Sequence, residues 1–302
     1  MTENYEAVKY RTAEDFLSAL RPSHKDWVGK NWTNPWIFRG HGDASWSLTP
    51  SAWRRSESDE AQFQSILKEI DDTRIKFALR DDFDWLLEED SNSARLLVAQ
   101  RRFEFWQAQT FSALADEIGA QIPGGQLPKV NPWESRAAEG LYPRPHPAFA
   151  LAQHHGMATR LLDWTRHPLF AAFFAAESTS SGDSAIAVWA LQRFQLFLKR
   201  CWVEYEVPRS QIGFLHSQAG LFLYHQSADE HFVKHGSWPC VENDCEHAWL
   251  KKLVLPRSEA SELRRLLFAE GVSRVHLMPT LDNIRATLQD VWRDVDNGEA
   301  SS

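Results

Sequence analysis

The change in hydrophobic period along the chain is the strongest constraint on its fold. Between about residues 56 and 118, apolar side chains such as Phe63 and Leu67 recur at intervals of three to four, which is typical of amphipathic helices. After residue 147, short apolar runs alternate with short helical patterns instead. Neither a purely helical bundle nor an all-β sandwich has both patterns, so we predict an α+β fold.

The predicted sheet lies mainly in the second half of the chain. The run Ala185–Leu191 is apolar at every position, which indicates a strand that is buried on both faces and therefore central. Further strands are predicted at Trp36–Gly40, Ser45–Pro50, Thr159–Thr165, Ala219–Tyr224, Lys252–Pro256 and Arg274–Met278. We therefore expect one domain over residues 1–302, with a mainly helical insertion over 56–145 and a frayed tail over 290–302.

The charge and cysteine content exclude several classes of protein. The chain has 33 basic and 41 acidic residues, a net charge of −8, which argues against broad binding to duplex DNA or to anionic membranes. Three cysteines are too few for a disulfide scaffold, and no apolar run reaches the length of a membrane-spanning helix. We expect a cytoplasmic protein without a membrane partner.

One short segment has residues that bind zinc in other proteins. Cys240, Cys245 and His247 lie close together in the sequence, and His235 precedes them. Their spacing does not fit a zinc finger or a zinc ribbon, and buried cysteine is common without a metal, so no metal is expected. Motifs for a P-loop, a dinucleotide-binding Rossmann fold and a zincin are also absent.

Two segments are richer in polar functional groups than their apolar settings require. The first is Phe38–Gly42, in which Arg39 follows a predicted strand and precedes Gly-His-Gly. An arginine held at this place offers a bidentate fork to a phosphate, and the glycines let a ligand approach the backbone. The second segment is Gln153–Thr165, which contains Gln-His-His-Gly and Thr-Arg-Leu-Leu-Asp-Trp-Thr.

These two segments together resemble the FRG-domain family, named for its Phe/Tyr-Arg-Gly tripeptide. The resemblance runs from about residue 34 to 288 and extends to further positions, namely Leu48–Ser51, Pro168, Ala171–Phe174, Gln218, Gly220, Phe222, Met278, Pro279, Leu281 and Asp282. An arginine after an aromatic residue on the first strand is also similar to the first motif of arginine-first ADP-ribosyltransferases. That similarity implies a sheet core like theirs, with the helical insertion after the first strands.

The similarity to ADP-ribosyltransferases also implies an activity, a substrate and a set of site residues. NAD is the expected substrate, and the activity is the modification of a macromolecule, either a nucleic acid such as RNA or a protein, by a toxin or defence effector with an antitoxin or chaperone as a further partner. The residues implied in catalysis are Arg39, Asp163, Gln218 and Glu206. The residues implied in binding NAD are Arg39, Gly40, His41, His154, Thr159, Arg160 and Thr165.

Two other functions are compatible with the same residues. His154 and His155 together with Arg39 have the chemistry of a metal-independent nucleotide or RNA hydrolase. The 14 tryptophans of the chain also suit a non-catalytic module that binds a partner through an aromatic face. Purely structural roles remain open for several residues, since Asp163 could pair with Arg160 or with Arg39 to hold the fold.

Overall fold

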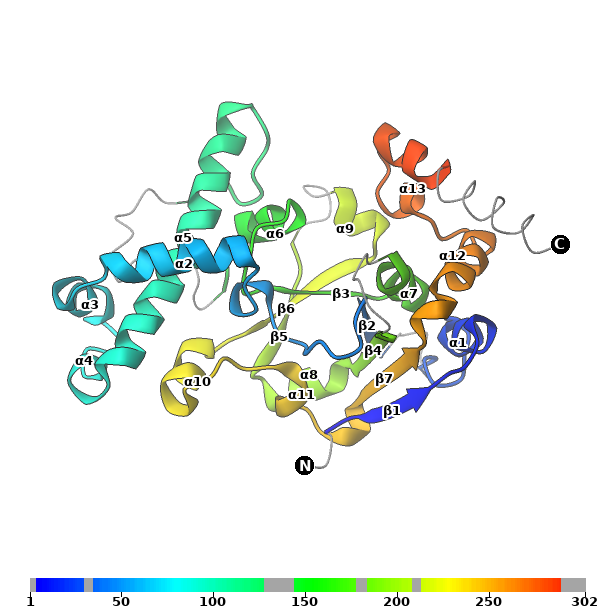
Figure 1. Cartoon of the computed structure of the whole chain (residues 1–302), viewed down its shortest axis with the longest axis horizontal. Helices are drawn as coiled ribbons and strands as arrows, with labels where there is room; N and C mark the ends of the chain where they lie inside the picture. The colour runs from blue at the N-terminus through cyan, green and yellow to red at the C-terminus, as the bar shows by residue number, and fades with distance from the viewer. Residues whose placement is uncertain (1–3, 30–34, 128–143, 178–183, 208–212, 289–302) are drawn as a thin grey trace.

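The computed structural model describes residues 4–29, 35–127, 144–177, 184–207 and 213–288. Within these ranges the chain folds around one seven-stranded sheet with helices on both of its faces (Figure 1). The predicted α+β class is confirmed. Five of the seven strands were predicted from the sequence, and two were not.

The strands of the sheet come from the whole length of the chain. In chain order they are β1 (Glu6–Lys9), β2 (Trp36–His41), β3 (Leu162–Thr165), β4 (Ile186–Gln192), β5 (Trp202–Tyr205), β6 (Gly220–His225) and β7 (Leu250–Leu255). Their order in the sheet is β1-β7-β4-β2-β3-β6-β5. Only the β1–β7 pair is parallel, and the other five pairs are antiparallel.

Strand β4 lies inside the sheet between β2 and β7, as its apolar sequence predicts. Every residue from Ile186 to Leu191 is buried, because helices or loops cover both faces at this point. Its antiparallel register with β2 places Trp189 opposite Arg39. The arginine of the first polar segment is therefore held on an interior strand, whose backbone is bonded on both sides.

One face of the sheet is covered by α1 (Ala13–Leu20), α7 (Pro168–Glu177) and α12 (Ala260–Ala269). Side chains of these helices pack on Phe38 of β2 and Val188 of β4 in one core. Helix α7 runs closest to β2 because its sequence, Pro-Leu-Phe-Ala-Ala-Phe-Phe-Ala-Ala-Glu, turns small alanines toward the strand.

The opposite face packs against α8 (Arg193–Lys199) and α11 (Val241–Asp244). Leu196 and Val241 from these helices join Ile37 of β2 in a second core that is rich in tryptophan. The remaining helices outside the insertion are α6 (Pro147–His154), α9 (Gly213–Ser217), α10 (Ala228–His235) and α13 (Arg274–Leu277). A further helical segment covers residues 281–288.

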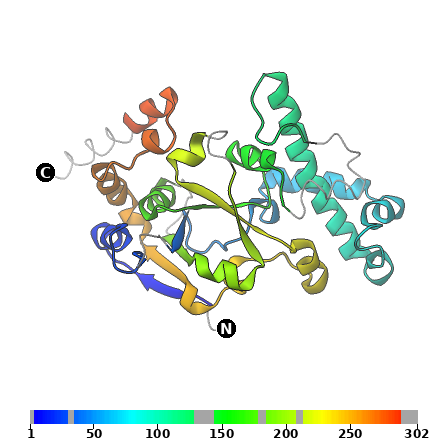
Figure 2. The same ribbon diagram turned by 180° about the vertical axis from the view of Figure 1, so that it is seen from behind.

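The helical insertion projects from one side of the sheet, as the two opposite views in Figures 1 and 2 show. Its helices are α2 (Glu57–Glu69), α3 (Asp72–Leu79), α4 (Leu86–Glu89) and α5 (Ser91–Glu117). Ser56 begins α2 with a capping box, in which the side chain of Asp59 accepts from the Ser56 N–H. The predicted insertion is helical up to residue 117, residues 118–127 contain no helix, and 128–143 lie outside the described residues, as does the predicted tail.

Two predicted strands are wrong. Ser45–Pro50 is irregular: the Asp43 side chain accepts from the Ser45 N–H at 2.8 Å, and the Glu242 carboxylate accepts from the Leu48 N–H at 2.9 Å in place of a neighbouring strand. Arg274–Met278 forms the short helix α13, in which the Leu277 N–H donates to the Ser273 carbonyl at 3.1 Å. Both segments are apolar enough for a strand, but side chains or local turns satisfy their backbone groups.

Two strands of the sheet, β1 and β5, were not predicted. Each has four residues, at the lower end of strand lengths, so the alternation of burial is too brief to stand out from the sequence. They form the two edges of the sheet. The interior strands were predicted: β2, β4, β6 and β7 have six or seven residues, and β3, with four, was predicted as part of the longer run Thr159–Thr165.

Candidate functional site

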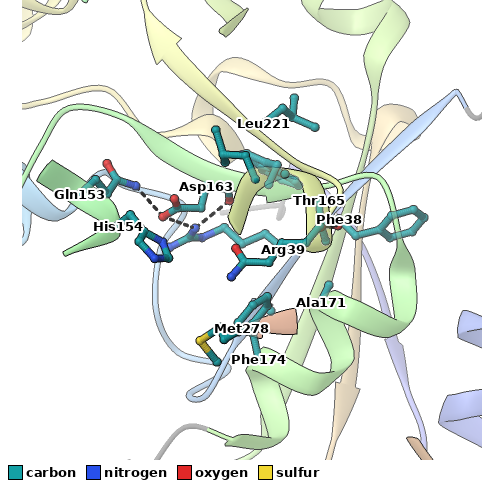
Figure 3. A pocket seen from close by; sticks show the side chains of 15 residues that line it. Phe38, Arg39, Gln153, His154, Asp163, Thr165, Ala171, Phe174, Leu221 and Met278 are labelled. Atoms are coloured by element: carbon teal, nitrogen blue, oxygen red, sulfur yellow. Dashed lines mark hydrogen bonds and ion pairs between the residues drawn. The ribbon is translucent and has the colours of Figure 1, made fainter. Parts of the chain in front are cut away.

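A cavity of about 360 Å³ lies beside β2, β3 and β6, between helices α6 and α7 (Figure 3). This volume is in the range of pockets that hold small ligands. The residues that line it are Phe38, Arg39, Gly40, Gln153, His154, Asp163, Trp164, Thr165, Ala171, Phe174, Leu215, Gln218, Gly220, Leu221 and Met278. Both polar segments of the sequence therefore contribute to the same cavity.

Arg39 is fixed in the cavity by contacts at two of its nitrogens. Its Nε donates to His41 Nε2 at 3.1 Å, and its Nη1 donates to the backbone carbonyl of Asp163 at 2.7 Å. Burial lowers the pKa of Arg39 and the nearby Asp163 carboxylate opposes that shift, yet an arginine remains protonated at neutral pH. The structure gives no hydrogen bond to Nη2 among the described residues, so part of the guanidinium fork faces the cavity without a protein partner.

Asp163 provides the carboxylate nearest to Arg39. Its Oδ2 lies 3.5 Å from Arg39 Nη1 and accepts a hydrogen bond from Gln153 Nε2 at 2.5 Å (Figure 3). The Asp163 side chain is 57% exposed, whereas that of Arg39 is 16% exposed. This ion pair is therefore open to solvent on its carboxylate side, where a ligand can reach both charges.

Gln153 holds this arrangement together, although the sequence did not mark it as a site residue. Its amide nitrogen donates to Asp163, and its amide oxygen accepts from the Thr159 hydroxyl. The Thr159 hydroxyl in turn accepts from the Leu161 N–H at 3.2 Å, which ties the start of β3 to the end of α6. The signal that could have identified Gln153 is its place directly before the paired histidines.

His154 lines the cavity, but His155 does not. The two rings meet edge to face with centroids 5.2 Å apart, and His155 also stacks on Phe111 of the insertion with ring centroids 5.6 Å apart. Burial and then the neighbouring His155 lower the pKa of His154, while Asp163 raises it. His154 is therefore neutral at pH 7 and able to accept a proton.

Thr165 and Gln218 meet at the floor of the cavity. The Thr165 hydroxyl donates to the Gln218 carbonyl at 2.7 Å and accepts from the His167 N–H at 3.1 Å. The Gln218 amide donates to the Leu277 carbonyl at 3.4 Å, which connects this floor to α13. Both residues line the cavity, and these hydrogen bonds hold its walls in place.

Gly40 lines the cavity, yet its missing side chain serves the packing of α7. A Cβ atom added to Gly40 would lie 2.7 Å from the Ala175 backbone nitrogen and closer still to the Ala171 carbonyl oxygen. Any larger residue would push the helix away from β2. The expectation that this glycine lets a ligand approach the backbone is therefore replaced by a packing role.

Three residues expected at the site do not line the cavity. His41 is buried on β2, where its Nδ1 lies 3.2 Å from Trp189 Nε1, and burial followed by the charge of Arg39 lowers its pKa well below the usual value. Thr159 is buried behind Gln153. Both act on cavity residues through hydrogen bonds. Glu206 lies elsewhere and pairs with Arg166.

Arg160 is also outside the cavity, although it lies in the same sequence block as Asp163. Its Nε donates to Glu104 of α5 at 2.6 Å, and its Nη2 lies 3.6 Å from Asp229 of α10. Arg101 of α5 completes the group through a 2.6 Å bond to the same Asp229. Arg160 therefore ties the helical insertion to the sheet and is not among the residues that line the cavity, and its expected role in binding NAD stays a prediction.

The tryptophans within the described ranges do not form a common exposed face. Trp27, Trp36, Trp164, Trp189 and Trp202 are buried, with Trp164 also at the cavity wall. Among the described residues, the tryptophans that count as exposed are Trp46 and Trp85, at 39% and 44%. They lie in different parts of the fold, one after β2 and one in the insertion, so an aromatic docking face finds little support.

Apolar residues at the open side of the cavity were not predicted as site residues. Phe174 of α7 and Met278 after α13 lie beside each other below Arg39 (Figure 3). Both are packing residues in the sequence pattern, and no local signal separates them from the core. The antiparallel pairing of β3 with β6 brings Leu221 to the same cavity.

Comparisons with known proteins identify one family. The family model of the FRG domain matches residues 126–184. This range includes the Gln153–Thr165 block and helix α7, whereas Arg39 lies before it. No curated protein and no solved structure matches the chain. In the part of the chain that the structure describes, no helix is long and apolar enough to span a membrane. The chain carries an FRG domain, and the resemblance expected from its sequence is confirmed.

Proposed function

We propose that this FRG-domain protein binds NAD in the cavity around Arg39 and transfers ADP-ribose to a macromolecule. The observation that carries the proposal is the convergence of Arg39, His154 and Asp163 from three separate elements on one cavity. A fixed cation, a neutral base and a carboxylate are the groups that such a transfer uses. The likeness of the sheet to ADP-ribosyltransferases stays a prediction.

Arg39 is the group that would hold the diphosphate of NAD. Its guanidinium is charged and largely buried, with Nη2 facing the cavity and Nη1 shared with Asp163. A guanidinium binds phosphate through two parallel hydrogen bonds, and partial burial strengthens that attraction. The hydrogen bond from Arg39 Nε to His41 sets the plane of the fork.

Asp163 and His154 would act on the ribose end of NAD. In the transfer, the bond between ribose C1′ and the nicotinamide nitrogen breaks, and nicotinamide leaves with the electron pair of that bond. Positive charge develops at the ribose, which the Asp163 carboxylate stabilises. A nucleophile on the acceptor bonds to C1′ and gives its proton to a base, for which neutral His154 is suited.

Asp163, and not Glu206, is the carboxylate that this proposal assigns to the transfer. Asp163 lines the cavity, whereas Glu206 is paired with Arg166 and is absent from the lining residues. Gln218 has no charge to offer, and its amide is bonded to the Leu277 carbonyl. The hydrolase alternative required both histidines, and His155 is stacked on Phe111 outside the cavity.

Release of nicotinamide from NAD tests the proposal. Purified wild type is incubated with NAD and either total RNA or a protein extract, and nicotinamide is measured by chromatography. We expect release with at least one acceptor, and a loss of about 100-fold or more in Asp163→Asn and in Arg39→Gln, in line with the removal of one electrostatic group. Circular dichroism checks that both variants are folded.

Matched controls come from the exposed ion pair of Glu262 and Arg265 on α12, which lies outside the cavity. Glu262→Gln and Arg265→Gln make the same chemical changes and should leave release unchanged. No release by the wild type with either acceptor would contradict the proposal. A loss in Glu206→Gln with Asp163→Asn unaffected would overturn the assignment of the carboxylate.

A further inference from the structure

We propose that Cys201, His225 and Asp244 form a binding site for one divalent transition-metal ion of the zinc type. Each of these side chains offers one ligand atom, and the three atoms lie within 4.8 Å of one another. Within the described residues, it is the group in which at least three histidine, cysteine or acidic side chains bring their ligand atoms this close together. Cys240, Cys245, His247 and His235, the residues suggested by the sequence, are not in it.

The pairing of β5 with β6 brings the first two ligands together. Cys201 directly precedes β5, and His225 ends β6. The register pairs Trp202 with His225, and the Gln226 N–H donates to the Cys201 carbonyl at 2.9 Å. Cys201 and His225 are far apart in the sequence, so no local motif records their contact.

Asp244 reaches the same place from α11, on the face of the sheet that α8 and α11 cover. Its Oδ2 accepts from Trp202 Nε1 at 2.7 Å and lies 3.8 Å from His225 Nε2. A hydrogen bond from a neighbouring side chain fixes the orientation of a carboxylate ligand, as is common around metal ions. Asp244 is thus held in position by a group other than the other two ligands.

The burial of His225 also supports a bound ligand at this place. Its side chain is 4% exposed, its Nδ1 is buried without a hydrogen bond, and its Nε2 is too far from Asp244 for one. A buried ring nitrogen without a hydrogen bond is costly, and a metal bond at Nε2, the atom that lies 3.8 Å from Asp244, removes that cost for this nitrogen.

The ligand types select the class of metal. One thiolate, one imidazole and one carboxylate suit zinc and related first-row ions, whereas calcium and magnesium take oxygen ligands. With zinc bonds of about 2.0–2.3 Å, ligand atoms around a tetrahedral ion are separated by roughly 3.3–3.8 Å. The distance of 3.8 Å between His225 Nε2 and Asp244 Oδ2 meets this spacing, and all three ligand atoms lie within 4.8 Å of one another.

The site is separate from the cavity around Arg39. Gly220 at the start of β6 lines that cavity, and His225 ends the same strand. The two ends are about 17 Å apart at the rise of an extended strand. A metal ion here would fasten the β5–β6 edge of the sheet to α11. This inference goes beyond the proposed function and does not depend on it.

Titration of the metal-free full-length protein with Co²⁺ tests the site. We expect one equivalent to bind, with a thiolate-to-cobalt charge-transfer band and the visible absorption of tetrahedral cobalt, and Zn²⁺ should displace it. The charge-transfer band should disappear in Cys201→Ser. In Asp244→Asn, which keeps an oxygen for the Trp202 indole, affinity should fall at least 10-fold.

Cys240→Ser is the matched control, because Cys240 caps α11 but is outside the group of three. Its spectrum should equal that of the wild type. Absence of the charge-transfer band in the wild type, or an unchanged band in Cys201→Ser, would overturn the proposal. If Cys201→Ser does not fold, methylation of the Cys201 thiol in the folded wild type, with and without Zn²⁺, decides: protection supports the site, and equal rates overturn it.

Discussion

Two arginine–carboxylate arrangements in this protein have similar chemistry and opposite settings. Arg160 and Glu104 are 1% and 0% exposed, joined at 2.6 Å, and further bonded to neighbouring side chains. Arg39 and Asp163 are 3.5 Å apart, with the carboxylate open to solvent. Arg160 and Asp163 lie three residues apart in one sequence block, so the block serves both the fold and the cavity.

The comparison indicates that burial distinguishes an ion pair that stabilises the fold from one that is open to a ligand. A buried ion pair resists removal of one partner, because an uncompensated charge then remains in the interior. An ion pair that is open to solvent contributes little to stability, so it is available for another use, such as binding a ligand. Four measurements test this distinction, in order of decreasing expected effect on the free energy of unfolding.

Glu104→Gln is expected to have the largest effect. It removes the carboxylate nearest to buried Arg160, whose Nη2 lies 3.6 Å from Asp229, and the free energy of unfolding should fall by about 3–5 kcal/mol. Urea denaturation followed by circular dichroism measures the change. The control is Glu60→Gln, since Glu60 pairs with Arg55 at the same 2.6 Å but is 43% exposed, and it should cost less than about 1 kcal/mol. Equal losses in the two variants would contradict the role of burial.

Gly40→Ala should destabilise the protein by about 1–3 kcal/mol, because its methyl group meets the backbone of α7. Thermal and urea unfolding measure this loss. Gly213→Ala is the counterpart, since a Cβ at Gly213 meets no atom within 4 Å, and stability there should be unchanged or slightly higher. A neutral Gly40→Ala would show that α7 does not pack on β2 as closely as described.

Lowering the pH should reduce the free energy of unfolding, because His41 on β2 is buried. Burial lowers the pKa of His41 in the folded state, so the unfolded state binds more protons below its pKa of about 6.5. The free energy of unfolding is therefore highest above pH 6.5 and falls as the pH drops below it. Urea denaturation at a series of pH values should show a shallower fall in His41→Gln. An identical pH dependence in wild type and variant would exclude this contribution.

Asp163→Asn should have the smallest effect on stability, less than about 1 kcal/mol, because the carboxylate is 57% exposed and Arg39 keeps its hydrogen bond to the Asp163 backbone carbonyl. The same variant is expected to lose the proposed release of nicotinamide. Urea denaturation and the release assay on one preparation measure both. A loss of several kcal/mol would assign Asp163 to the fold, together with Arg160.

The sequence allowed the fold class, the interior strands and the place of the helical insertion to be predicted. Their apolar runs are long enough to show a period without knowledge of partners, as in Ala185–Leu191. The short edge strands and the helix α13 could not be predicted, because tertiary contacts decide the conformation of such segments. Thus Glu242 satisfies the Leu48 backbone where a strand was expected.

The candidate site was predictable in part for a similar reason. Arg39, Gly40, His154, Asp163, Thr165 and Gln218 were all named from the sequence and all line the cavity. The assignment failed for Arg160, whose partner Glu104 comes from the distant helix α5. Phe174 and Met278 could not be named because an apolar residue at a cavity looks the same in the sequence as one in the core.

The most direct measurement of the central claim is the shift in thermal unfolding that NAD produces. A ligand that binds the folded state at 100 times its dissociation constant stabilises that state by about 2.7 kcal/mol. The wild type and the control Arg265→Gln should therefore unfold at a higher temperature in saturating NAD, and Arg39→Gln should not shift. An absent shift in the wild type, or an equal shift in Arg39→Gln, would contradict the claim that the cavity around Arg39 binds NAD.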